Sequence, residues 1–250
     1  MKIREVFDFL NSIAPYDTQC SWDNSGLMTG SPEKETDKIM LCLDCTNDVL
    51  EQAKANDCGL IICHHPLIFS PLKSVCDNTT VYNAIKNDIT VISAHTNLDM
   101  AQGGVNDVLC EKLGLKNTET IQTQDGPLLR MGDTSFETVT EFASLVAKTL
   151  GEPVQCLDAG RKVSKVAVCG GAGGDFVADA FSAGCDTFVT GEAKHHQFLE
   201  AKELGINLIV AGHFSTEKPV VENLCDKLLS AFPGHSVYVA FEECPYFTVV

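Results

Sequence analysis

The chain has 250 residues, of which 44% are hydrophobic and 21% charged, and its net charge is −16 at pH 7. This length and composition are typical of a globular protein with one large or two ordinary domains. An acidic chain repels phosphate backbones, so nucleic-acid binding is disfavoured. No apolar run approaches the roughly 20 residues that span a bilayer, and the N-terminus reads as an amphipathic helix rather than a signal peptide. We therefore expect a cytoplasmic protein without membrane contact.

The first 115 residues alternate short apolar runs with amphipathic stretches, which predicts alternating strands and helices. Thr46 is placed to cap the second helix, because its hydroxyl can accept a backbone N–H of the first turn. The predicted helices cover residues 2–13, 47–55, 80–87 and 105–113, and the predicted strands cover 39–43, 60–63 and 89–93.

Residues 115–135 are polar and turn-like, so we expect an internal boundary there. A helical stripe over 136–150 follows, and the alternation then resumes. Strands are predicted over 166–169, 187–190, 206–210, 236–241 and 246–250, and helices over 175–183, from the second His pair to 204, and over 216–230.

Strands that alternate with helices favour an α/β fold with right-handed crossovers. The two halves of the chain resemble each other, because 57–62 aligns with 184–189 and 87–95 aligns with 204–213. We predict two similar α/β lobes with mostly parallel sheets and a metal site in the cleft between them. The first lobe is expected to comprise residues 1–118 and 218–250, and the second 119–217.

Six of the seven histidines lie in four short stretches that follow predicted strands. In open α/β sheets, ligands bind at the carboxyl ends of the strands, and scattered core histidines would not cluster in this way. Histidine and carboxylate ligands together suit Zn, Fe, Mn or Ni better than Mg or Ca. The four stretches are Cys63-His64-His65-Pro66, Ala94-His95-Thr96-Asn97-Leu98-Asp99, Gly191-Glu192-Ala193-Lys194-His195-His196 and Gly212-His213-Phe214-Ser215-Thr216-Glu217.

The geometry of each stretch limits what it can do. In a regular strand, adjacent His64 and His65 would point to opposite faces, but a turn before Pro66 would bring both to one side. His213 and Glu217 are four residues apart and share a face if they open a helix. The predicted metal ligands are His64, His65, Asp99, His213 and Glu217.

Other histidines have several possible roles. His95 is either structural, an orienting partner of the ligands, or, with Glu192, a group that moves protons during catalysis. His195 and His196 lie on a predicted helix, where adjacent residues diverge by about 100°. For these two, contact with a substrate is favoured over metal ligation.

Two further motifs have simpler interpretations. Cys42-Leu43-Asp44-Cys45 has the spacing of a redox pair, but Cys42 falls on a buried strand. Gly170-Gly171-Ala172-Gly173-Gly174 lies between a strand and a helix, where phosphate is often bound. It lacks the Walker lysine, so a tight turn is favoured.

These motifs, together with Trp22-Asp23-Asn24-Ser25-Gly26-Leu27 and Leu43-Asp44-Cys45-Thr46, resemble the GTP cyclohydrolase 1 type 2 homolog family. The resemblance covers nearly the whole chain. It implies two divalent metal ions held by the five predicted ligands, with Glu217 between the ions. It also implies a homo-oligomer, a hexameric ring with the metal sites facing an inner cavity.

The expected function is that of a metal-dependent hydrolase acting on a nucleotide, such as GTP, or on a related small molecule. Two ions would activate a water molecule and polarise the substrate. The alternative is a metal-handling or regulatory protein without turnover.

Overall fold

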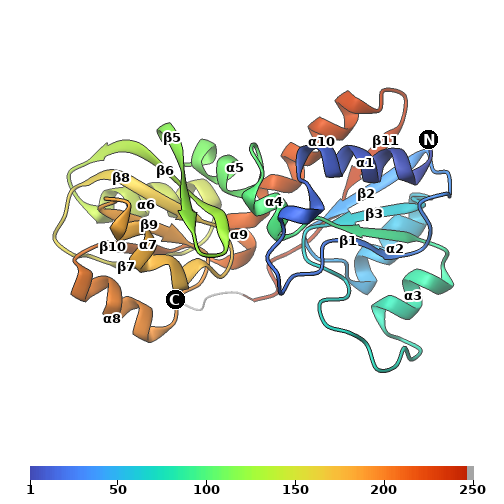
Figure 1. Cartoon of the computed structure of the whole chain (residues 1–250), viewed down its shortest axis with the longest axis horizontal. Coiled ribbons are helices and arrows are strands. Elements are labelled where there is room, and N and C mark those ends of the chain that lie inside the picture. Colours follow the sequence, from blue (N-terminus) through green and yellow to red (C-terminus); the bar gives the residue numbers. More distant parts are fainter. Residues whose placement is uncertain (247–250) are drawn as a thin grey trace. The chain divides into compact units, whose positions relative to one another are not determined.

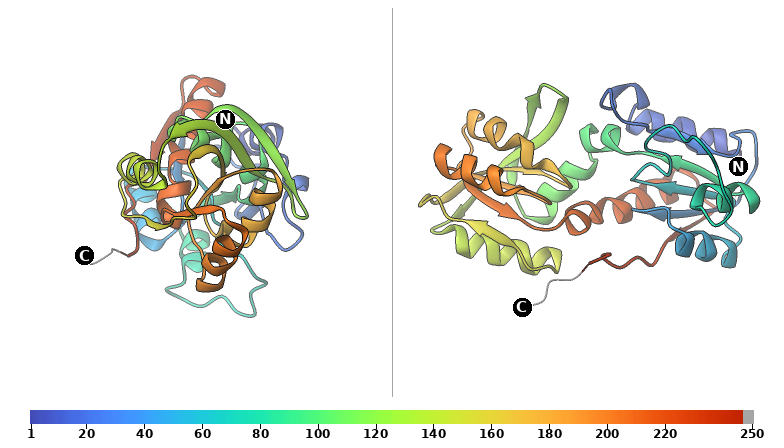
Figure 2. Two further views of the ribbon diagram at one scale, coloured as in Figure 1. Left: turned by 90° about the vertical axis from the view of Figure 1, so that its left-hand side faces the viewer. Right: turned by 90° about the horizontal axis from the view of Figure 1, so that it is seen from below.

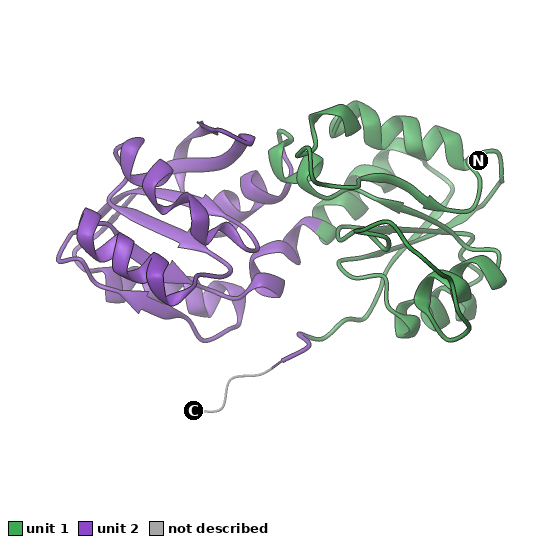
Figure 3. Ribbon diagram, turned by 60° about the horizontal axis from the view of Figure 1, so that its bottom comes forward, with its two compact units in different colours: residues 1–102, 221–243 green, residues 103–220, 244–250 purple. Residues whose placement is uncertain are grey.

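The computed structural model describes residues 1–246, which form two compact α/β units. Unit 1 comprises Met1–Gln102 and Val221–Glu243, and unit 2 comprises Gly103–Val220 with residues 244–246 of the described chain (Figure 3). The strand predicted over 246–250 lies outside the described residues from position 247 on. Across residues 1–246, none of the helices has the length and hydrophobicity needed to span a membrane.

Unit 1 is built on a five-stranded sheet in the order β1-β4-β3-β2-β11. Only β1 pairs in the antiparallel sense among these described strands. Helices α1 and α10 cover one face of the sheet, and α2 and α3 cover the other (Figure 1). The strands are β1 (Gly26–Thr29), β2 (Lys38–Cys42), β3 (Leu60–Cys63), β4 (Thr90–Ser93) and β11 (Ser236–Val239), and the helices are α1 (Ile3–Ile13), α2 (Asn47–Ala55), α3 (Thr80–Lys86), α4 (Thr96–Met100) and α10 (Pro219–Ala231), with a 3-10 turn over Tyr16–Thr18.

Unit 2 is built on a six-stranded sheet in the order β5-β6-β8-β9-β10-β7. The sheet is mixed: β8, β9 and β10 are parallel, whereas the strands outside them pair antiparallel. The α6 helix lies on one face, and α7 and α8 lie on the other (Figure 2). The strands are β5 (Lys116–Thr123), β6 (Gly126–Phe136), β7 (Gln155–Leu157), β8 (Val163–Cys169), β9 (Thr187–Thr190) and β10 (Asn207–Val210), and the helices are α5 (Val105–Lys112), α6 (Val139–Leu150), α7 (Val177–Ser182), α8 (His195–Leu204) and α9 (His213–Glu217), with a 3-10 turn over Gly173–Phe176.

The internal repeat appears as three parallel strands in each unit. In unit 1 these are β2, β3 and β4, and in unit 2 they are β8, β9 and β10. The segments that align in the sequence, 57–62 with 184–189 and 87–95 with 204–213, supply β3 with β9 and β4 with β10. The prediction of an α/β fold with two similar lobes is therefore confirmed. The expectation of a mostly parallel sheet holds for unit 1 but not for unit 2, where the β5-β6 hairpin and β7 add antiparallel pairs.

The prediction that residues 115–135 are turn-like is wrong, because β5 and β6 form an antiparallel hairpin there. In β5 only Ile121 and Thr123 are buried, so the strand lacks a strong apolar pattern. The turn falls on Gln124 and Asp125, and Gly126 follows with φ +121°. An Asp-Gly step is a common hairpin signal, and Asp125-Gly126 is the local pattern that indicates this hairpin in the sequence.

Helix α5 was expected in the first lobe but groups with unit 2. Its Leu109 and Cys110 are part of the core in which Phe142 and Val146 of α6 meet Val166 of β8. Unit 1 has its own core, formed where α2 and α3 pack on β2, β3 and β4. Each unit therefore has an independent apolar core, as a domain requires.

Replacing Phe142 by alanine should destabilise unit 2. Phe142 is fully buried and contacts Phe136, with ring centroids 5.2 Å apart. Loss of a buried Phe side chain costs about 3–5 kcal/mol because a cavity remains. Urea unfolding followed by circular dichroism measures the loss. Leu199→Ala is the control, because Leu199 is 48% exposed and its change should stay within about 0.5 kcal/mol. Equal effects of the two variants would contradict this core assignment.

Candidate metal centre

Strand register brings the first group of candidate ligands together at one edge of the unit 1 sheet. Cys42 of β2 lies opposite Cys63 of β3, and Cys63 lies opposite Ser93 of β4. Two residues further along the three parallel strands stand Asp44, His65 and His95. The carboxyl ends of neighbouring parallel strands meet at the same edge, so these three side chains form a row.

His64 and His65 converge although they are adjacent in the chain. A bend directly after β3 turns the backbone, and the two ring centroids lie 5.0 Å apart. The His95 ring lies 5.1 Å from that of His64 and 5.5 Å from that of His65. One nitrogen from each ring lies within 4.8 Å of the other two. The turn predicted before Pro66 is present, and the three imidazoles could hold a metal ion together.

Each of these three rings has its Nδ1 atom hydrogen-bonded to an oxygen. A carbonyl or carboxylate oxygen can only accept, so Nδ1 carries the hydrogen and the neutral ring has its lone pair on Nε2. Ligand histidines in metalloproteins are commonly fixed in this way. The pairs are His64 Nδ1 with Ala94 O at 2.8 Å, His65 Nδ1 with Asp44 Oδ1 at 2.8 Å, and His95 Nδ1 with Asp23 Oδ1 at 2.7 Å.

Asp23 is a buried, multiply bonded carboxylate. Besides His95 it accepts hydrogen bonds from the Thr96 amide at 3.0 Å and from the Asn24 amide at 2.7 Å. Burial alone would raise the pKa of Asp23, but the hydrogen bonds from His95 and Thr96 outweigh it and hold that pKa well below its usual range. Asp23 therefore stays ionised and keeps the His95 ring in one orientation.

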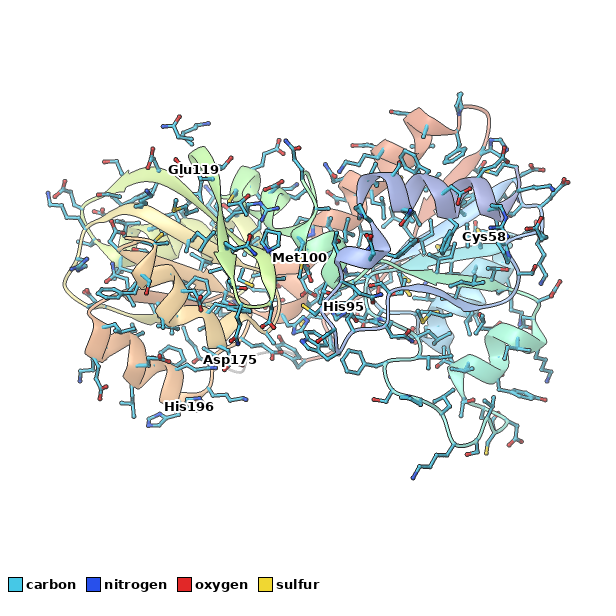
Figure 4. The ribbon with its side chains drawn as sticks, in the orientation of Figure 1. Cys58, His95, Met100, Glu119, Asp175 and His196 are labelled. Atoms are coloured by element: carbon cyan, nitrogen blue, oxygen red, sulfur yellow. The ribbon has the colours of Figure 1, made fainter. Side chains whose placement is uncertain are left out.

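Asp99 lies one helical turn beyond His95. The α4 helix begins directly after His95, and the Asp99 amide donates to the His95 carbonyl. This turn places Asp99 Oδ1 3.7 Å from His64 Nε2. Unit 1 therefore brings His64, His65, His95 and Asp99 into one group (Figure 4 labels His95).

Unit 2 brings together the other predicted ligands. His213 and Glu217 begin and end α9, and His213 Nε2 lies 3.1 Å from Glu217 Oε2. The shared helix face predicted for this pair is thus present. His213 Nδ1 contacts Glu192 Oε1 at 3.0 Å, so this ring, like those of unit 1, is oriented by an oxygen at Nδ1. Glu192 follows β9 and plays for His213 the part that Asp44 plays for His65.

The glycine-rich segment after β8 makes room for this pair. Gly171 has φ +62°, and a Cβ atom there would overlap Glu217 Oε1 and lie 3.2 Å from His213 Nε2. The amides of Gly171 and Gly173 donate to the hydroxyls of Thr216 and Thr190. These amides already have acceptors within the protein, so the segment is better explained as a tight turn than as a phosphate-binding loop.

A cavity of about 460 Å³ lies within unit 2, and its lining includes Glu192 and Gly212, the residue before His213. The polar residues of its lining include Asp175, Glu192, Lys194 and Tyr246. His195 and His196 are exposed on the first turn of α8, where Figure 4 labels His196, and among the described residues neither lines this cavity. The structure gives no support to their predicted contact with a substrate there.

The cysteine pair shows no sign of redox chemistry. All described cysteines are free thiols. Burial raises the pKa of the Cys42 and Cys45 thiols well above the usual range. Both therefore stay protonated at neutral pH, whereas a redox thiol needs its thiolate form.

Two orienting residues were not predicted, although both lie in motifs that the sequence made conspicuous. Asp44 stands two residues after β2, and Asp23 stands in the loop before β1. Knowing the order of parallel strands would have indicated Asp44, since it must lie beside His65. Asp23 contacts His95 from 72 residues away, which no local pattern predicts.

The chain matches the family model described as Duf34/NIF3 (NGG1p interacting factor 3) over residues 1–245. It is 34% identical to a protein of Clostridium perfringens named GTP cyclohydrolase 1 type 2 homolog, across 97% of each chain. It is 33% identical to a protein of the same name from Clostridium acetobutylicum, across 92% of this chain and 91% of the other. A crystal structure of a hypothetical protein of Staphylococcus aureus is similar, with a TM-score of 0.92 and 28% identity over 100% of this chain and 99% of that one.

Replacing Gly171 by alanine should weaken metal binding at the His213–Glu217 pair. The new methyl group would overlap Glu217 Oε1 and displace the carboxylate, and such shifts typically cost 10–100-fold in metal affinity. Competition with a chromophoric chelator measures the affinity. Gly151→Ala is the matched control, because Gly151 has φ +75° with nothing within 4 Å of a Cβ atom. Equal affinities of Gly171→Ala and Gly151→Ala would show that Gly171 does not shape the site.

Proposed function

Since the chain belongs to the Duf34/NIF3 family, we propose that it binds two divalent metal ions and hydrolyses a nucleotide or a related small molecule. The proposed ligands are His64, His65 and Asp99 from unit 1 with His213 and Glu217 from unit 2. That the ligands from unit 1 and those from unit 2 bind the same two ions is part of the proposal.

One observation carries this proposal: four histidines, drawn from both units, each have Nδ1 hydrogen-bonded to an oxygen. A histidine with a purely structural role in a core needs only a hydrogen-bond partner for its ring nitrogens. Four rings that are each oriented by an oxygen at Nδ1, with carboxylates 3.7 Å and 3.1 Å from two of the Nε2 atoms, have the arrangement common to histidine metal ligands. The donor set of imidazoles and carboxylates fits Zn, Fe, Mn or Ni.

Bound ions of this kind would supply Lewis-acid activation of water and of the electrophilic centre of the substrate. The chain's own residues would orient the histidine rings and transfer protons. The ionised Asp23 keeps the His95 ring in place so that Nε2 can accept a proton. Glu192 orients His213 through Oε1, and its side chain is 54% exposed, so it can also exchange protons with solvent. The proton-transfer roles of His95 and Glu192 stay predictions.

The names of the relatives make GTP the first substrate to test. A homo-oligomer, specifically a ring of six chains, also stays a prediction, which light scattering on the purified protein would check.

Single ligand substitutions should lower the metal content. Protein purified without chelators should hold about two ions per chain by elemental analysis. His65→Ala and Glu217→Gln should each hold about one ion fewer, because each removes a donor atom while leaving the fold. His196→Ala is the control, since His196 is exposed on α8 and should retain the wild-type content. Unchanged metal in both ligand variants would refute the assignment.

The metal-loaded protein should consume at least one nucleotide of a panel that includes GTP. Chromatography of the reaction mixture gives the rate, which should fall at least about 100-fold on chelation or with Glu217→Gln, because preorganised metal activation is lost. Complete metal loading without turnover of any substrate would instead favour the metal-handling alternative.

A further inference from the structure

Two large aromatic side chains are exposed beside the three imidazoles of unit 1. Trp22 is 55% exposed and Phe69 is 51% exposed. The Trp22 centroid lies 6.2 Å from that of His95, and the Phe69 centroid lies 6.3 Å from it. Rings of this size are usually buried more deeply, so their exposure at this place requires an explanation.

The loops that carry these rings are fixed. The residue after Trp22 is Asp23, whose carboxylate is hydrogen-bonded to His95. The next residue, Asn24, donates from its side-chain amide to the Ile68 carbonyl at 2.6 Å, directly before Phe69. The two rings lie 6.0 Å apart at an interplanar angle of 46°. The hydrogen bonds thus tie down the loops that carry the rings, which lowers the entropic cost of ordering these loops on binding.

We infer that Trp22 and Phe69 form a stacking subsite for a planar nitrogen heterocycle, which presents its edge to His95 and the neighbouring imidazoles. The inference rests on the proposed function, because it names the class of substrate for the same site. Aromatic side chains stack on planar bases, and this stacking depends little on which base is bound. Both rings stand at a steep angle to the His95 ring, 74° for Trp22 and 78° for Phe69, so a heterocycle stacked on either of them would lie next to the groups that carry the chemistry.

The alternative occupant of an exposed aromatic pair is a second copy of the chain. The position favours the heterocycle. Both rings touch His95, and the connection through Asp23 and Asn24 couples the pair to the candidate ligands rather than to a remote face. A contact between copies would need no such link to the imidazoles.

Trp22 is the only tryptophan of the chain, so its fluorescence reports directly on this subsite. Metal-loaded protein is titrated with GTP and with ATP, and inorganic triphosphate serves as the probe that has the charge but no ring. Both nucleotides should quench the emission saturably, and triphosphate should not. The readout requires no turnover.

Variants then assign the quench to stacking. Phe69→Ala should weaken GTP binding about tenfold or more, as loss of a stacking ring does. Leu72→Ala is the control: Leu72 is 49% exposed in the same connection between β3 and α3, and the affinity should stay within about twofold. By calorimetry, Trp22→Ala should also bind about tenfold more weakly, whereas Trp22→Phe, which keeps a ring, should bind nearly as well as the wild type. Metal content should be unchanged in all four.

Three results would overturn the inference. The first is absence of saturable quenching by either nucleotide in protein that holds its full metal. The second is wild-type affinity in both Trp22→Ala and Phe69→Ala. The third is a lower molecular mass of Trp22→Ala in light scattering with unchanged affinity, which would assign the surface to contacts between copies. If the wild-type protein binds no metal, the proposed function itself is wrong, and the premise of this subsite is lost with it.

Discussion

The site depends on one repeated interaction, the hydrogen bond from a histidine Nδ1 atom to an oxygen. Asp44, Asp23 and Glu192 accept from His65, His95 and His213, and a backbone carbonyl accepts from His64. Without these bonds the rings could rotate and exchange tautomers, and Nε2 would have no defined position. The sheets matter for function because they place each acceptor at the end of the strand or loop beside its histidine.

The repeat gives each unit the same three parallel strands but not the same chemistry. Unit 1 places three imidazoles and Asp99 around the end of its sheet, whereas unit 2 contributes His213 and Glu217 from a short helix after β10. The second His pair, which resembles the first in sequence, is exposed on α8 instead. A related backbone therefore carries a histidine-rich group in one unit and a carboxylate-backed histidine in the other.

Much of this arrangement could be predicted from the sequence, because it follows from local patterns. The buried strands β2, β3 and β10 are apolar apart from the first residue of β2 and of β10, and the Thr46 cap marks the start of α2. The i, i+4 spacing likewise indicated that His213 and Glu217 share a face. The hairpin of β5 and β6 was missed because its exposed strand is polar, and Asp23 was missed because its contact with His95 is set by tertiary packing alone.

The position of β11 in the sheet has a consequence for synthesis of the chain. This C-terminal strand pairs with β2, with Val237 opposite Ile39, so unit 1 is completed only by its last residues. Unit 2 lies almost entirely between the two segments of unit 1 and can fold as soon as it is made. Until β11 arrives, the apolar strand β2 is an open sheet edge, the kind of surface that pairs with other chains. Of the two units, unit 1 therefore keeps an unpaired strand edge for longer during synthesis, although its first segment is made before unit 2.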